Sequence, residues 1–141
     1  MKVASGLAVC AAAFASEVAS EEQTAMGRAL YLTHCAACHG NNGEGGTQPV
    51  GEQQTRPPDL TKIAQRRSGV WPILEVMSII DGYTKATRPR EGMPVIAALN
   101  EGPQVTFDSG NGRSRNVARR LLAVTTYLET IQSPKPDRSV P

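Results

Sequence analysis

The chain has 141 residues, of which 40% are hydrophobic, 20% charged and 4% aromatic, within the ordinary range for one globular domain. The net charge is only +2, and no run of basic residues alternates with aromatic residues, so the composition argues against a nucleic-acid-binding surface. The 13 glycines and 10 prolines leave fewer positions for regular structure. We therefore expect that something other than a large apolar core, such as a bound cofactor, helps to stabilise the fold.

Residues 1–15 have the pattern of a secretory signal peptide. Lys2 supplies a positive start, an apolar stretch follows, and Ala13-Phe14-Ala15 has the small-x-small pattern of a signal-peptidase site. The segment is shorter than the roughly 20 apolar residues that a transmembrane helix needs, and no later apolar run approaches that length. These features predict export to the periplasm, no transmembrane segment and a single domain over residues 16–141.

A competing interpretation treats Leu7-Ala8-Val9-Cys10 as a lipoprotein box that would leave Cys10 lipidated. Val9 argues against it, because the residue before a lipidated cysteine is normally Gly, Ala or Ser. The sequence therefore favours cleavage after Ala15 over a lipid anchor through Cys10.

A first helix is expected to begin at Glu21, because Ser20 and Gln23 have the spacing of a capping box. Gly27 inside this helix costs about 1 kcal/mol relative to Ala, which makes sense if another helix crosses closely at that point. Apolar residues at mixed three- and four-residue spacing predict one buried stripe, formed by Ala25, Met26, Ala29, Leu30 and Leu32.

The sequence Cys35-Ala36-Ala37-Cys38-His39 follows this helix and has the pattern of a c-type haem attachment site. In such a site two thiols add to the vinyl groups of the porphyrin, and the adjoining imidazole binds iron. A thioredoxin-like redox motif is disfavoured because no βαβ pattern surrounds the cysteines. A zinc site is disfavoured because His34 is the sole other histidine and two further ligands would be required.

Further elements are predicted along the rest of the chain. A short helical turn is expected over residues 60–67, and a helix with Pro72 in its first position is expected to end at Gly82. Residues 105–115 predict either a small hairpin or an irregular loop. The last helix has the clearest periodicity and should end before Pro134; its apolar stripe comprises Val117, Leu121, Val124, Leu128 and Ile131.

Iron would need a second axial ligand besides His39, and the candidates are His34, Met26, Met77 and Met93. His34 directly precedes Cys35 on the proximal side, and Met26 lies on a buried helical stripe where methionine is usually core filler. Met77 occupies an ordinary core position of its helix, although that helix can line a haem pocket. Met93 lies between Gly92 and Pro94 in a stretch without helical pattern, as a distal ligand requires, or packs on the haem without a bond.

The chain resembles the class I c-type cytochromes, small monohaem electron carriers, over most of residues 16–141. The matching residues are Cys35-Ala36-Ala37-Cys38-His39-Gly40, the glycine-rich segment 41–46, Pro57-Pro58-Asp59-Leu60-Thr61, Gly92-Met93-Pro94 and Tyr127-Leu128. The resemblance implies an all-α fold of roughly three to five helices around one covalently bound haem c. It also implies that the C-terminal helix crosses the first helix at Gly27, and it supports Met93 as the iron ligand.

Further residues are predicted to contact the proximal imidazole and the haem propionates. A ligating imidazole normally donates its other N–H to a carbonyl, and the resemblance places that carbonyl at Pro49, with Pro57 as the alternative. Trp71 and Arg56 are candidate donors to the haem propionates, although a half-buried Trp covering the pocket and a solvated Arg are equally ordinary roles.

With both axial positions filled by protein, the sequence predicts a periplasmic one-electron carrier that is not an enzyme and meets redox donor and acceptor proteins transiently. One alternative is a haem-based sensor in which Met93 dissociates to admit a small ligand. Another is a haem subunit of a larger oxidoreductase, with the loop over 95–114 as a docking element. Docking is expected at the apolar segment 95–98, surrounded by the cations Lys85, Arg88 and Arg90.

Overall fold

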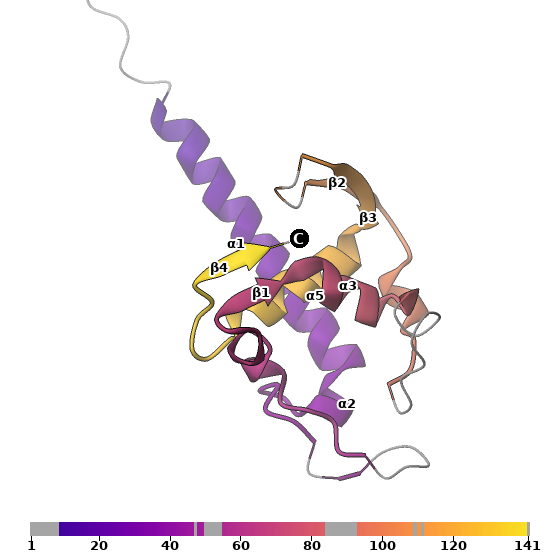
Figure 1. The fold of residues 1–141 in the computed structure, drawn as a ribbon. Coiled ribbons are helices and arrows are strands. Elements are labelled where there is room, and N and C mark those ends of the chain that lie inside the picture. The colour runs from indigo at the N-terminus through magenta and orange to yellow at the C-terminus, as the bar shows by residue number, and fades with distance from the viewer. Residues whose placement is uncertain are drawn as a thin grey trace, which may run out of the picture.

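The computed structural model describes residues 9–46, 48–49, 55–83, 93–108, 110 and 112–140. Two helices dominate the described part of the chain, and shorter elements surround them (Figure 1). The elements in chain order are α1 (Val9–His34), α2 (Ala36–His39), η1 (Leu60–Lys62), η2 (Gln65–Arg67), β1 (Val70–Pro72), α3 (Ile73–Ile80), η3 (Ala97–Leu99), β2 (Gln104–Asp108), β3 (Ser114–Ala118), α5 (Arg119–Thr130) and β4 (Arg138–Val140).

Helices α1 and α5 cross (Figure 1). Gly27 makes the close contact at the crossing possible. A Cβ atom at Gly27 would lie 2.0 Å from the carbonyl oxygen of Ala123 and 2.8 Å from Cβ of Tyr127. One turn along α1, the ring of Tyr31 packs against the ring of Tyr127 with their centroids 5.4 Å apart. The prediction that a glycine in the first helix permits a close crossing by the C-terminal helix is confirmed.

Helix α1 begins earlier than the capping box predicted. It runs from Val9 through Ser20, whose carbonyl accepts a hydrogen bond from the Thr24 hydroxyl at 3.0 Å, so the predicted start at Glu21 is wrong. The physical reason is the alanine-rich stretch upstream, where high helix propensity extends the helix past a usable cap. Cleavage after Ala15 stays a prediction.

The described residues also form two small sheets, so the expectation of an all-α fold needs correction. Strands β2 and β3 pair antiparallel, with Val105 opposite Val117, which confirms the hairpin alternative for residues 105–115. Val117 therefore lies in a strand, and α5 begins at Arg119. Strands β1 and β4 pair in parallel. They are three residues each and come from distant parts of the chain, so no local periodicity could have indicated their pairing.

Helix α3 buries the predicted apolar face, formed by Ile73, Val76, Met77 and Ile80. Gly82 follows the helix with a φ of +87°, which agrees with the predicted stop. Pro72, predicted to be the first helical residue, instead ends β1 and precedes the helix. The two short 3₁₀ turns η1 and η2 account for the helical turn expected over 60–67. Within the described residues, no helix has the length and apolar character needed to cross a bilayer.

We predict that Gly27→Ala destabilises the protein by about 1 to 3 kcal/mol or more, because the new methyl group meets the Ala123 carbonyl and α1 must shift from α5. The measurement is thermal unfolding followed by circular dichroism. The expected buried stripe of this helix is wrong, because Ala25, Ala29 and Leu32 are exposed. The matched control is therefore Ala29→Leu, which should change stability by at most about 0.5 kcal/mol. Equal stability of Gly27→Ala and the wild type would contradict the close crossing.

Candidate functional site

The Cys-x-x-Cys-His segment lies at the junction where α1 ends and the single turn α2 begins (Figure 1). The Cys35 amide donates to the Tyr31 carbonyl at 2.8 Å, and the His39 amide donates to the Cys35 carbonyl at 2.9 Å. Cys35 packs partly buried against the core, whereas Cys38 is exposed, and both are free thiols. Burial, with a smaller contribution from Cys38, raises the pKa of Cys35 to about 11. The Cys35 side chain is therefore a neutral thiol at pH 7.

His39 is buried and has a defined hydrogen-bond partner. Its Nδ1 lies 3.2 Å from the carbonyl oxygen of Pro58. Burial lowers the pKa of His39, and the contact with the Pro58 carbonyl opposes that shift. The carbonyl can only accept, so Nδ1 of the neutral ring carries the proton and Nε2 keeps its lone pair. A neutral imidazole with one nitrogen held by a carbonyl is the form in which histidine binds a metal.

The carbonyl partner of His39 differs from both predicted residues. Pro49 is exposed, and the carbonyl of Pro57 accepts from the Gly46 amide at 3.2 Å, which leaves Pro58 to face the imidazole. The assignment to Pro49, or to Pro57, is therefore wrong. The sequence signal was the Asp59 that follows: its side chain accepts from the Thr61 amide at 2.8 Å, begins η1 and so fixes the orientation of the extended Pro57-Pro58 segment.

The glycine-rich segment folds back against the attachment turn. Gly45 has a φ of +103°, and a Cβ atom at Gly46 would lie 2.4 Å from the Cys38 carbonyl and 2.9 Å from Cδ of Pro57. Glycine is required here because a side chain would separate the two segments. A cleft of about 170 Å³ lies at this point, lined by Ala36, Ala37, Cys38, Gly40, Gly45, Gly46 and Gln48.

Tyr31 supports the same turn and was not singled out from the sequence. Its side chain is fully buried, and its hydroxyl donates to the Gly40 carbonyl at 2.6 Å. Burial is the largest cause that raises the pKa of Tyr31 to about 12, so the hydroxyl keeps its proton and acts as a donor. A usable signal was its position four residues before Cys35, one helical turn from the motif.

Trp71 is fully buried, and its Nε1 is the one buried side-chain polar atom without a hydrogen-bond partner in the described part of the chain. An indole N–H is a donor only, and leaving it unpaired in the interior is costly. The arrangement fits a group that brings an acceptor to this position, as a haem propionate would. Arg56 is exposed, and its predicted contact with a propionate stays a prediction.

Two of the candidate axial ligands belong to the core region. Met77 is buried between Ile73 and Ile80, and Met93 is partly buried and packed against the same core cluster. His34 and Met26 are half-buried on α1. The structure thus brings both Met77 and Met93 to the core. Gly92, which precedes Met93, lies outside the described residues, as do Lys85, Arg88 and Arg90.

The donor set of the described residues fits haem better than zinc. No group of three or more His, Cys, Asp or Glu side chains gathers there as a metal site would need. Two thiols, one buried neutral imidazole and one buried indole donor are instead what a covalently attached, axially ligated porphyrin with carboxylates would contact.

Comparisons with known proteins agree with this chemistry. The family model described as Cytochrome c matches residues 24–101, which is more than half of the chain. The match begins in α1, includes the attachment motif, the Pro58 segment, Trp71 and Met93, and ends just after η3. No curated protein and no solved structure matches the chain.

We predict that Tyr31→Phe destabilises the protein by about 1 to 3 kcal/mol, because the Gly40 carbonyl loses its 2.6 Å donor while the ring packing is kept. Denaturant unfolding measures the change. Tyr127→Phe, at the ring that packs against Tyr31, is the matched control and should be close to neutral, because the Tyr127 hydroxyl makes no hydrogen bond within the described residues. If both variants unfold with the same midpoint, the hydroxyl does not support the turn.

Proposed function

The chain belongs to the cytochrome c family, whose members bind haem c covalently and transfer electrons, and we propose that it is a periplasmic one-electron carrier with one haem c. The observation on which the proposal rests is the buried His39 in the attachment motif, with Nδ1 held by the Pro58 carbonyl. When bound, the haem supplies the Fe(III)/Fe(II) couple. We also propose that the protein is not an enzyme, because an iron with both axial positions filled by protein side chains transfers electrons and leaves no position for a substrate.

In this proposal the attachment motif holds the haem at three points. Cys35 and Cys38 form the two thioethers, one from the partly buried side of α2 and one from its exposed side. His39 provides the proximal nitrogen, and the Pro58 carbonyl fixes the ring orientation and increases the basicity of the ligand. Tyr31 and the glycine-rich segment both contact this turn and keep it in place.

Met93 is the proposed second axial ligand. Its side chain packs against the core, and Pro94 follows it in a segment without regular structure, so the backbone can approach the haem without a helix intervening. A thioether ligand favours the ferrous state and raises the reduction potential. Met77, the alternative, is already surrounded by the apolar side chains of α3.

Trp71 is the proposed donor to a haem propionate, because its indole N–H is buried and has no partner in the described residues. Such a bond stabilises the negative charge of a carboxylate that the core would otherwise have to neutralise. Arg56, exposed next to Pro57, is a weaker candidate for the same role.

Redox partners are proposed to dock near the segment after Met93. Val95 is 46% exposed there, and Pro94 and Ala97 are exposed as well, which gives a small apolar area. A small contact area allows fast release, as transient electron transfer requires. The paired strands β2 and β3 follow this segment, and docking onto a larger oxidoreductase through them is the second candidate function.

We predict that the haem stays on the protein during acid–acetone extraction, because both thiols form thioethers. Cys35→Ala or Cys38→Ala should leave a single thioether or fail to mature, which the absorption spectrum of the pyridine haemochrome reports. Recovery of free haem from the wild-type protein would refute covalent attachment.

We predict that Met93→Ala lowers the reduction potential, removes the Met-to-iron charge-transfer band and opens the iron to cyanide or CO. Met77→Ala is the matched control: it should cost about 2 to 5 kcal/mol of stability as a buried cavity, with the axial spectrum intact. The reverse pattern would transfer the ligand role to Met77. A wild-type protein that is high-spin and lacks the band at neutral pH would instead favour the sensor function.

A further inference from the structure

The end of the chain returns to the strand that contains Trp71. Strand β4 lies beside β1 and pairs with it in parallel (Figure 1). The register places Ser139 opposite Trp71. The family match ends at residue 101, so β4 lies outside the matched region. Ser139 and Glu129, the latter near the end of α5, line the same cleft, so β4 also lies beside α5.

Several hydrogen bonds connect the segment between α5 and β4 to residues 60–64. Gln132 is buried, and its Nε2 donates to the Leu60 carbonyl at 2.8 Å while its Oε1 accepts from the Ala64 amide at 3.0 Å. The Ser133 amide donates to the Thr61 carbonyl at 2.9 Å. These contacts attach the start of the tail, residues 132–140, to η1 and the turn after it.

The same tail then reaches the turn that leads into β1. The Asp137 amide donates to the Gly69 carbonyl at 2.8 Å. A Cβ atom at Gly69 would lie 2.1 Å from Asp137 Oδ2, so the Asp137 side chain covers this turn closely. The tail therefore contacts the chain immediately before Trp71 and then runs beside it.

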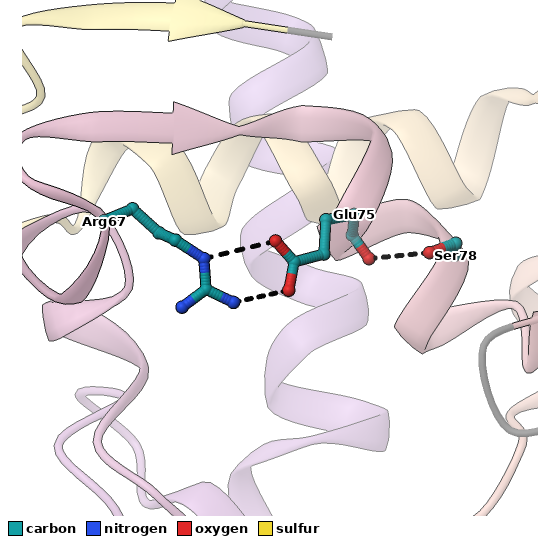
Figure 2. A network of polar contacts seen from close by, with 3 residues as sticks. All are labelled: Arg67, Glu75 and Ser78. Carbon is teal, nitrogen blue, oxygen red and sulfur yellow. Dashed lines mark hydrogen bonds and ion pairs between the residues drawn. The ribbon is translucent and has the colours of Figure 1, made fainter. Parts of the chain in front are cut away.

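A third contact fixes β1 from the side of α3. Figure 2 shows the Arg67 guanidinium facing the Glu75 carboxylate, with Nε 3.2 Å from Oε2 and a second bond between Nη2 and Oε1. The pair joins the residue before the β1 turn to the first turn of α3. Because both side chains are partly exposed, the ion pair contributes little to the free energy of unfolding. Its main effect is to hold the residue before the turn at a fixed distance from α3. Trp71 thus lies in a segment that is held at both ends and along one edge.

Strand β4 contributes little buried surface of its own. Arg138 and Ser139 are exposed and Val140 is half-buried, whereas Trp71 and Pro72 in the paired strand are buried. Strand β4 therefore acts on β1 through backbone pairing. The pairing fixes the orientation of β1, and the orientation of β1 determines the direction of its side chains. The side chain concerned is the indole whose N–H has no partner among the described residues.

We propose that β4 is a positioning element for Trp71: it holds β1 so that the indole N–H meets a haem propionate, and so it helps to set the reduction potential. This inference rests on the proposed function, since it requires a bound haem. Ser139 and its neighbours act through Trp71 and do not themselves contact the haem in this proposal.

The test uses the haem-loaded protein and a variant that ends at Pro136. The deletion removes Asp137 and Arg138 together, so the net side-chain charge of the protein is unchanged. The chain has a single tryptophan, so one indole resonance in a ¹⁵N–¹H spectrum reports Trp71 alone. We expect that resonance to shift and its N–H to exchange at least about tenfold faster. We also expect the reduction potential to fall, in the same direction as in Trp71→Phe.

Two control variants and one alternative test variant separate the possible causes. Arg138→Gln keeps the strand and should leave both readouts unchanged. Val117→Ala weakens the separate β2–β3 hairpin and tests whether a general loss of stability moves the potential. Ser139→Pro disrupts β4 opposite Trp71 within the full-length chain, and replaces the truncation if the shorter chain fails to fold.

An unchanged indole resonance and potential in the truncated protein, or in Ser139→Pro, would overturn the inference while the indole contact stands. An unchanged potential in Trp71→Phe would overturn the inference together with the proposed propionate contact. In both cases covalent haem attachment through Cys35 and Cys38 would be unaffected, because acid–acetone extraction tests it independently.

Discussion

The close crossing of α1 and α5 at Gly27 is the constraint on which the rest of the structure depends. It brings Tyr127 against Tyr31, and Tyr31 in turn holds the Gly40 carbonyl at the end of the attachment motif. Just after the C-terminal end of α5, the Gln132 side chain donates to the Leu60 carbonyl and accepts from the Ala64 amide. The crossing at Gly27, which requires the absence of a side chain, thus positions both the attachment turn and the segment that faces it.

The segment that faces the attachment motif is organised by backbone carbonyls more than by side chains. The carbonyls of Pro57 and Pro58 accept from the Gly46 amide and from His39, and neither proline has an amide donor of its own that needs a partner. Asp59 then starts η1 and fixes the direction of this segment. The result is a buried, neutral imidazole with a single nitrogen left for a ligand, at a low cost in burial of charge.

Trp71 differs from His39, because its indole N–H has no hydrogen-bond partner among the described residues. Its indole donor is buried without an acceptor, although the strand that contains it is attached to β4 and follows a turn joined to α3 by the Arg67–Glu75 pair. A fold that holds an unpaired donor so firmly gains from a ligand that supplies the acceptor. Haem binding and folding are therefore expected to be coupled in this protein, as the glycine and proline content also indicates.

The sequence by itself determined the attachment motif, its histidine, the close helix crossing at Gly27 and the apolar face of α3, because each depends on local spacing or on the absence of a side chain. It misplaced the start of α1 and the carbonyl partner of His39, and it missed β4, which pairs with β1 across more than 60 positions of the chain. The start of α1 was misplaced because the alanine-rich stretch extends the helix past the capping box. The carbonyl partner of His39 and the pairing of β4 depend on which distant backbone groups meet. Only the tertiary structure decides that, since carbonyls and amides are the same in every residue that can present them.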